Sequence, residues 1–157
     1  MDSSYTFLKA AIELADENIS QQGGGPFGAV VVKEGKIVAR AVNTVTTGND
    51  PTAHAEVNAI RTACRTLQTF DLSGCEIYCS CEPCPMCLAA IYWARIEKIY
   101  YAGTRFDAQQ AGFDDSFIYE ELEKPVPERK IPICQQLGDE GAKPLRRWAT
   151  TDDKTHY

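Results

Sequence analysis

Three cysteines lie within seven residues in the segment C-E-P-C-P-M-C, at positions 81 to 87. Thiols packed this closely can form disulfides, close a structural zinc site, or hold a catalytic metal that keeps one position open. The chain carries 7 cysteines, an odd number, and we expect a cytoplasmic protein, in which thiols stay reduced. The pattern therefore favours metal ligation or thiol reactivity over disulfides.

Two of these thiols are well placed to share a metal. Cys84 and Cys87 are three positions apart at the start of a predicted helix, so both project from its first turn on nearly the same side. The positive end of the helix dipole and a metal both lower a thiol pKa. Zinc needs three protein ligands and a water for catalysis, or four protein ligands for structure. The pair therefore requires at least one further ligand.

Two histidines are available as the next ligand. His156 lies in a polar tail, whereas His54 stands in P-T-A-H-A-E at the start of another predicted helix, with Glu56 two positions on. Ligation by His54 and the two thiols leaves zinc a position for water, whose pKa falls to about 7, and leaves Glu56 free to carry protons. A fourth ligand, Cys81, would instead close a structural site. The remaining cysteines are expected to be small core residues: Cys64, Cys75, Cys79 and Cys134.

Periodic patterns indicate the elements that must bring these residues together. Helical spacing is found over 5–19, from about 52 and over 84–95, and β-branched runs predict strands over 28–32, 37–42, 75–80 and 98–102. The first two strands flank a turn at Gly35 and read as a hairpin. Short helices are expected within 107–111 and 113–122, followed by a proline-rich connector over 123–132. The order predicts one domain over 1–157, an α/β sheet with helices on both faces and a parallel crossover.

Charge and hydropathy limit the partners. Lys and Arg number 16 against 22 Asp and Glu, which gives a formal net charge of -6. Proteins that grip a phosphate backbone gain affinity from clustered positive charge, so nucleic acid is not expected and a small, weakly charged ligand is favoured. No run approaches the roughly 18 apolar residues of a membrane span, so we expect no membrane partner.

The two motifs together match a known signature. His54-x-Glu56 followed by Pro83-Cys84-x-x-Cys87 is the pattern of zinc-dependent nucleobase deaminases. The surrounding segments G-G-P-F-G-A-V-V-V, N-D-P-T-A-H-A-E-V, S-C-E-P-C-P-M-C, I-Y-W-A-R and A-G-F-D-D-S-F-I-Y resemble the bacterial guanine deaminases of the cytidine deaminase-like superfamily. The resemblance runs from about Phe7 to Tyr119. It implies a three-layer α/β/α fold with a mixed central sheet of about five strands.

The resemblance also implies an activity. It is the hydrolytic deamination of guanine to xanthine and ammonia by a zinc-bound hydroxide, with one Zn²⁺ per subunit held by His54, Cys84 and Cys87. Glu56 would shuttle protons, and Asp115 would accept from the base and help to protonate the departing amine. The other substrate-binding residues implied are Asn43 on a polar edge of the base, Phe27 and Trp93 as apolar walls, and Tyr157 as a closing residue.

Each of these residues also has a structural explanation. Asn is common in turns, and Asp114 or Asp115 could cap a helix. The aromatic residues could belong to the core, and polar termini usually fray. The sequence alone leaves these alternatives open.

Family resemblance further implies a homodimer in which a C-terminal segment, about 145–157, is exchanged with the partner. Three rival functions remain: a tRNA adenosine deaminase, a nucleoside deaminase acting on guanosine or cytidine, and a zinc-stapled interaction module without catalysis. The acidic charge argues against the first, and Glu56 argues against the last.

Overall fold

The computed structural model describes residues 3–157 and gathers them into two compact units. The first unit extends to Ser116, and the second unit covers Phe117–Tyr157. The expected organisation, a single domain with an exchanged C-terminal segment, stays a prediction. All of the motifs that carry the candidate chemistry, from His54 to Asp115, lie in the first unit.

A mixed four-stranded sheet forms the centre of the first unit. The strands are β1 (Gly28–Lys33), β2 (Lys36–Val42), β3 (Cys75–Cys81) and β4 (Lys98–Gly103), and their order in the sheet is β2-β1-β3-β4. β1 is antiparallel to β2 and β3, whereas β3 and β4 are parallel. The mixed sheet and the parallel crossover are confirmed, and the described residues supply four strands where about five were expected.

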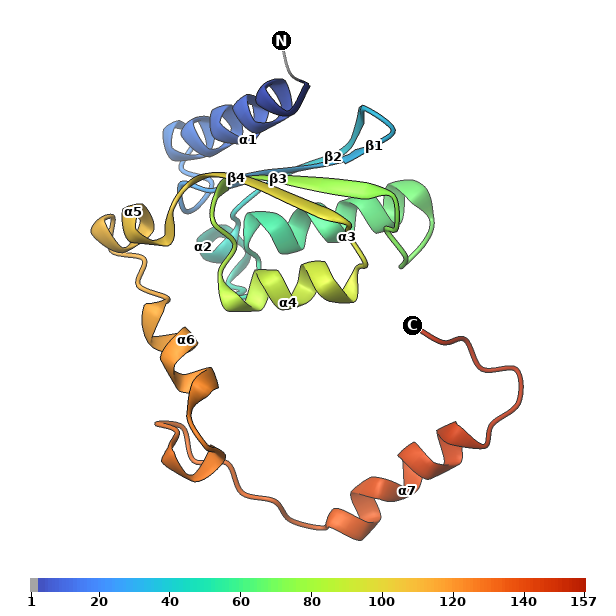
Figure 1. Cartoon of the computed structure of the whole chain (residues 1–157). Helices are drawn as coiled ribbons and strands as arrows, with labels where there is room; N and C mark the ends of the chain where they lie inside the picture. Colours follow the sequence, from blue (N-terminus) through green and yellow to red (C-terminus); the bar gives the residue numbers. More distant parts are fainter. Residues whose placement is uncertain (1–2) are drawn as a thin grey trace. The chain divides into compact units, whose positions relative to one another are not determined.

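Helices cover both faces of this sheet (Figure 1). α1 (Ser3–Ser20) lies on one face, where Val30, Val32 and Tyr78 pack with it. α3 (Ala55–Leu67) and α4 (Pro85–Trp93) lie on the other face, against residues of the opposite pleat such as Val31 and Ile77. Successive strand residues point to opposite faces of the sheet, so one continuous β-branched run contributes side chains to the hydrophobic layers on both faces. The predicted three-layer α/β/α architecture is confirmed.

The turn between β1 and β2 has the geometry that the hairpin requires. Glu34 and Gly35 have φ values of 50° and 72°. Two central residues with positive φ characterise a type I′ turn, whose twist matches that of paired strands, and glycine adopts this conformation without cost. The turn sets the pairing of Lys33 with Lys36, and a bulge between Val31 and Val32 then shifts the register by one residue, so that Gly28 lies opposite Val42.

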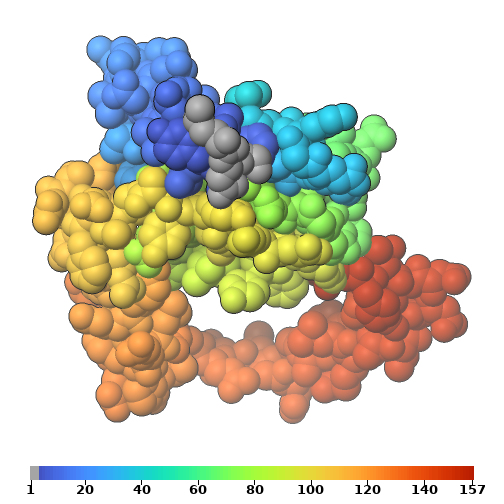
Figure 2. Space-filling model, turned by 45° about the horizontal axis from the view of Figure 1, so that its top comes forward, coloured from blue at the N-terminus to red at the C-terminus, as the bar shows by residue number. Residues whose placement is uncertain are grey.

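Shorter helices follow the core elements. α2 (Val45–Gly48) was not expected in the polar loop after β2. α5 (Arg105–Gln110) begins with a capping box formed by Thr104 and Asp107, and α6 (Ser116–Glu123) follows. In Figure 2, α1 and β4 lie side by side on the surface of the first unit.

The second unit has a different character. Its elements are the end of α6, the 3-10 turn Val126–Glu128 and α7 (Gly138–Ala149), and no residue from 117 to 157 is buried. Cys134 is exposed here, so its assignment to the core was wrong, whereas Cys75 and Cys79 are buried as expected. Across residues 3–157, none of the helices has both the length and the apolar character that crossing a membrane demands.

Candidate metal centre and active site

The metal motifs meet because two helices begin at the same place. His54 and Cys84 are the N-cap residues of α3 and α4, both extended, with ψ values of 156° and 169°. The expected helix starts near 52 and at 84 therefore move to Ala55 and Pro85. Proline is favoured in the first helical position and restricts the preceding residue to extended backbone, which accounts for the conformation of Cys84.

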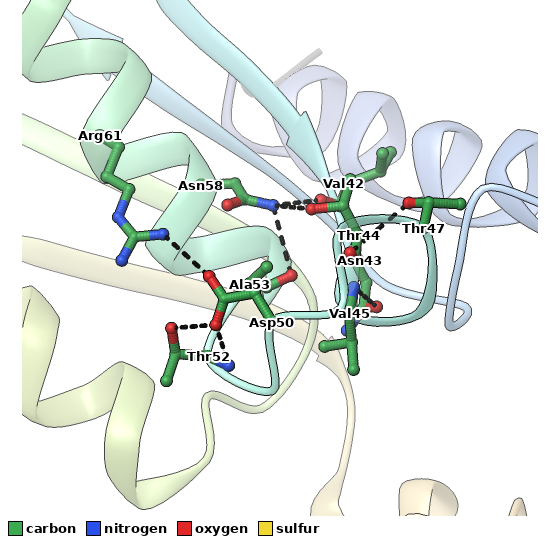
Figure 3. Close-up of polar contacts among 10 residues, drawn as sticks. All are labelled: Val42, Asn43, Thr44, Val45, Thr47, Asp50, Thr52, Ala53, Asn58 and Arg61. Carbon is green, nitrogen blue, oxygen red and sulfur yellow. Dashed lines mark hydrogen bonds and ion pairs between the residues drawn. The ribbon is translucent and has the colours of Figure 1, made fainter.

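A short network holds the turn before His54 (Figure 3). Asp50 Oδ1 accepts from the backbone N–H and the hydroxyl of Thr52, at 2.8 and 2.7 Å. Arg61 on α3 lies 3.8 Å from the other carboxylate oxygen of Asp50. The His54 N–H then donates to the Thr52 carbonyl at 2.8 Å. The polar segment N-D-P-T thus forms a fixed turn that delivers the imidazole to the start of α3.

Three potential ligand atoms converge at these helix ends. His54 Nδ1 lies 3.5 Å from Cys84 Sγ and 3.4 Å from Cys87 Sγ, and the three ligand atoms lie within 4.8 Å of one another. Tetrahedral zinc with bonds of about 2.3 Å to sulfur and about 2.0 Å to nitrogen separates such ligands by about 3.5 Å. The spacing and donor types of His54, Cys84 and Cys87 therefore fit a zinc ion.

The electrostatics of the two thiols also suit a cation. A hydrogen bond from Cys87, supported by His54, lowers the pKa of the Cys84 thiol to about 4. The same hydrogen bond raises the pKa of the Cys87 thiol, since removing its proton would place two thiolates side by side. The hydrogen bond to Cys84 raises the pKa of His54. A divalent cation supplies the charge that stabilises the second thiolate and the neutral imidazole.

Glu56 lies next to this cluster and is nearly inaccessible to solvent, with an exposure of 7%. Its Oε2 accepts a hydrogen bond from Cys87 Sγ at 3.4 Å. Burial raises the pKa of the Glu56 carboxyl, and the charge of Cys84 adds to the effect. His54 and Glu56 reach one point because His54 is the N-cap and Glu56 lies in the first turn of α3. A buried carboxyl with a raised pKa is suited to general acid and base catalysis.

Asn43 directly follows β2 and is 6% exposed. Its Oδ1 accepts from the backbone N–H groups of Gly25 and Val45, at 3.2 and 3.1 Å. Its N–H donates to the carbonyl of Phe27 at 3.1 Å. The side chain is therefore fixed by the loop before β1 and by the start of α2.

The two neighbouring acids have different environments. Asp114 Oδ1 accepts from the backbone N–H of Ser116 at 3.0 Å and from its hydroxyl, so Asp114 forms an Asx turn that leads into α6. Asp115 is half-buried, and burial together with the charge of Cys84 raises the pKa of its carboxyl. Asp115 also acts electrostatically on His54. Asp115, rather than Asp114, thus interacts with the metal cluster.

The predicted aromatic residues divide into three cases. Phe27 is half-buried and packs edge to face against Phe113, with ring centroids 4.9 Å apart. Trp93 is the last residue of α4, a helix of 9 residues and about 13 Å, and is 70% exposed. It therefore lies at the opposite end of α4 from Cys84. Tyr157 belongs to the second unit. The roles expected of Trp93 and Tyr157 stay predictions.

Cys81 makes a different contact from the ligand thiols. Its Sγ donates to the carbonyl of Thr104 at 3.4 Å, and burial raises its pKa to about 11. Glu82 accepts from the N–H of Arg105 at 3.0 Å, and its own N–H donates to Gly103 O at 2.8 Å. This part of the segment 81–87 joins the loop after β3 to the loop after β4.

Two residues near the site were missed in the sequence. Asn18 on α1 is buried and donates to the carbonyls of Gly25 and Asn43. Asn58 lies one helical turn after His54 on α3 and bonds residues on both sides of Asn43. Asn58 could have been predicted to lie near the site, because it follows His54 by four residues and such residues share a helix face. An asparagine in a surface-like helix pattern gave no such signal for Asn18.

Comparison with known proteins gives a consistent result. The family model described as "Cytidine and deoxycytidylate deaminase zinc-binding region" matches residues 1–103. A guanine deaminase from Bacillus subtilis (strain 168) is 55% identical over 152 residues, which is 97% of each chain. The crystal structure of guanine deaminase from Bacillus subtilis superposes with a TM-score of 0.94 at 54% identity, covering 98% of each chain.

Other relatives are less similar in sequence. A tRNA-specific adenosine deaminase from Aquifex aeolicus is 48% identical over 96 residues, which is 61% of this chain and 63% of that protein. A mutant of the protein NE0047 in complex with 8-azaguanine superposes with a TM-score of 0.68 at 34% identity, covering 71% of this chain and 64% of that one. Of these proteins, the guanine deaminase from Bacillus subtilis combines the higher identity with coverage of nearly the whole chain.

Proposed function

The chain belongs to the cytidine and deoxycytidylate deaminase zinc-binding family, and we propose that it hydrolyses guanine to xanthine and ammonia. The observation that carries the proposal is the convergence of His54, Cys84 and Cys87 with the buried carboxyl of Glu56 beside them. Likeness over nearly the whole chain to a guanine deaminase supports guanine as the base. A purine base is also consistent with the acidic net charge of -6.

Zinc held by one imidazole and two thiolates supplies an open position for water and lowers the pKa of that water toward 7. The chain's own contribution begins with Glu56. Its buried carboxyl, with a raised pKa, accepts one proton of the attacking water and passes it to a ring nitrogen of the base. It then accepts the second proton, from the hydroxyl that has been added to the base, and passes it to the amine, which leaves as ammonia. Proton transfer of this kind contributes roughly 10²- to 10⁴-fold to the rate.

Two polar side chains orient the base in the proposal. Asp115 accepts from the amidine edge of guanine and helps to protonate the leaving amine, which its position near Cys84 supports. Asn43 hydrogen-bonds another edge, and its buried, fixed amide supports this role. Phe27 supplies an apolar wall with Phe113 behind it. A planar base with polar edges suits this combination.

Closure of the site and assembly form a further part of the proposal. Tyr157 closes the site and Trp93 contributes a second wall, within a homodimer in which the segment from about 145 to 157 is exchanged. Support comes from the exposed apolar residues of the second unit, which have no core of their own: Ile131, Ile133, Leu137, Leu145 and Trp148. An exchanged segment buries such residues at low cost.

A substrate panel tests the proposed function. Ammonia release is measured with guanine, guanosine, adenine, cytosine, cytidine and a tRNA that carries the target adenosine. Guanine should be the preferred substrate, with activity lost after zinc chelation and recovered on adding zinc. If guanine is inert while another base reacts, the assignment to guanine fails and the metal chemistry stands.

tRNA adenosine deamination is the second candidate, because the Aquifex tRNA deaminase is 48% identical to this chain over 96 residues. The tRNA in the substrate panel distinguishes the two candidates, because only a tRNA adenosine deaminase should release ammonia from it. Glu56→Ala separates catalysis from a zinc-stapled module. In both cases the variant should keep its zinc. Loss of ammonia release in the variant indicates an enzyme, whereas a zinc-stapled module would bind its partner as before.

A further inference from the structure

Asn43 offers the substrate a donor and no free acceptor. Both neighbours of its Oδ1, Gly25 and Val45, contribute backbone N–H groups, which can only donate. The amide orientation is therefore fixed by its partners, and the Nδ2 group is directed away from them. Among residues 3–157 no hydrogen bond is found for this Nδ2, and it is not a buried unsatisfied atom. It remains available to an acceptor on a ligand.

A second amide holds the backbone around Asn43 from the side of α1. Asn18 is 4% exposed, and its Nδ2 donates to the carbonyl of Gly25 at 2.8 Å and to that of Asn43 at 3.0 Å. One side chain thus fixes two residues at once: Asn43 itself, and Gly25, whose N–H orients the Asn43 amide. The two hydrogens of a carboxamide are both used in this way.

The glycine-rich loop is shaped around this contact. A Cβ on Gly24 would lie 2.3 Å from the Asn43 carbonyl oxygen, and a Cβ on Gly23 would lie 2.2 Å from Asn18 Oδ1. Neither position accommodates a side chain without moving one of the two asparagines. Glycines here allow the loop to approach closely enough for Asn18 to bridge Gly25 and Asn43.

A third amide acts from α3, on the opposite flank. Asn58 Nδ2 donates to the Val42 carbonyl and to Thr44 Oγ1, both at 2.9 Å, and approaches the Ala53 carbonyl at 3.3 Å (Figure 3). The residues before and after Asn43 are thereby joined to the residue before His54. The Thr44 N–H adds a bond to the same Ala53 carbonyl at 2.9 Å.

We propose that Asn18 and Asn58 are positioning residues that aim the Asn43 amide at an acceptor edge of the bound base and set its distance from the metal centre. The inference rests on the proposed function, in which Asn43 binds guanine. Neither residue touches the base. Each acts through Asn43: Asn18 on α1 bonds its carbonyl, and Asn58 on α3 bonds the residues on either side of it.

This assignment predicts a particular kinetic pattern. An Asn43 contact is made both with the bound base and in the transition state, so losing its alignment weakens both equally. Asn18→Ala and Asn58→Ala should each raise KM for guanine about tenfold, the change that corresponds to one displaced hydrogen bond. kcat and the zinc content per folded chain should stay within about twofold of the parent protein.

Double variants provide the decisive test. Asn43→Ala should raise KM at least as much as Asn18→Ala, and adding Asn18→Ala or Asn58→Ala to Asn43→Ala should change KM no further, because the residue through which they act is gone. If Asn18→Ala does not fold, the comparison of Asn43→Ala with the double variant Asn43→Ala/Asn58→Ala decides the question. Asn49→Gly is the matched control: it removes an exposed amide from the same loop, at a left-handed position that glycine tolerates, and should leave KM unchanged.

The possible failures are distinguishable. Additive effects of Asn18→Ala and Asn43→Ala on KM, or a fall in kcat and melting temperature with KM unchanged, overturn the positioning role while guanine turnover stands. An unchanged KM in Asn43→Ala itself removes the role of Asn43 and the inference with it. Absence of guanine turnover in the unmodified protein overturns the proposed function.

Discussion

The two units of the chain differ in how far they bury their apolar side chains. Every buried residue of the described chain lies between Ala11 and Ala94, in the first unit. The second unit carries Ile131, Ile133 and Leu137 on its surface, each more than half exposed. The first unit thus has a hydrophobic core although it also exposes apolar residues such as Tyr92 and Trp93, whereas the apolar residues of the second unit have no internal core.

Because of this difference, we expect the first unit to determine the stability of the protein and the second unit to contribute to binding of the substrate or the partner. The proposed catalytic groups are anchored by helix starts, a sheet and buried amides, all within the first unit. The proposed closing residue, Tyr157, lies in the unit without a core. Changes in the first unit should therefore affect chemistry or folding, and changes in the second should affect substrate retention or assembly.

Glu56→Gln should have the largest effect. Removing the proton carrier while keeping the shape should reduce kcat for guanine by about 10⁴-fold, the upper end for general acid–base catalysis, because Glu56 serves more than one transfer. Ammonia release gives the rate, and metal analysis gives the zinc content, which should be unchanged. A variant that loses zinc in proportion to activity would place Glu56 among the ligands instead.

Core substitutions test the contrast directly. Ile77 is fully buried, so Ile77→Ala should lower the free energy of unfolding by about 2–5 kcal/mol. Ile133 is exposed, so Ile133→Ala should change it by less than about 0.5 kcal/mol at protein concentrations where the chain is monomeric. Urea titration followed by circular dichroism measures both. Equal losses would show that the second unit is packed in solution as tightly as the first.

The adjacent acids form a matched pair. Asp115→Asn removes a charged acceptor beside the metal cluster and should lower kcat/KM for guanine by about 10- to 100-fold, the range for hydrogen bonds to charged groups. Asp114→Asn keeps a side-chain oxygen that can accept from Ser116 in the same turn and should leave kcat/KM within about twofold. Steady-state kinetics on both variants decides between them. A reversed order would assign the recognition of the base to Asp114.

Shortening the tail should give the smallest effect on the enzyme and none on the first unit. Deleting residues 150–157 should raise KM for guanine about tenfold, which corresponds to one lost contact, without lowering the melting temperature. Tyr157→Phe should show only the part of the change that depends on the hydroxyl. Unchanged turnover and KM in the truncated protein would remove Tyr157 from the site.

Most of the first unit could be predicted because its signals are local. β-branched runs and a glycine turn define β1 and β2, and Pro85, in the first helical position, marks the start of α4. His54, Cys84 and Cys87 could be identified because metal coordination demands specific residue types at fixed spacings. Such constraints can be recognised in a single sequence.

The remainder depends on contacts that a linear pattern does not contain. α7 includes Gly141 and Pro144, which argue against a helix, yet acidic residues at its start and basic residues at its end complement the helix dipole. Asn18 looks like a surface residue of α1, and its burial follows from carbonyls in a loop that folding brings to it. Aromatic residues such as Trp93 suit a pocket, a core or a surface equally well by sequence alone.

The chain has only two tryptophans, and each unit holds one of them: Trp93 at the end of α4 and Trp148 in α7. Their exposures, 70% and 47%, leave both rings open to changes in polarity. Replacing either with phenylalanine turns the other into a single fluorescent reporter, so the optical response of each half of the molecule to guanine, zinc or dilution can be recorded separately with no added label.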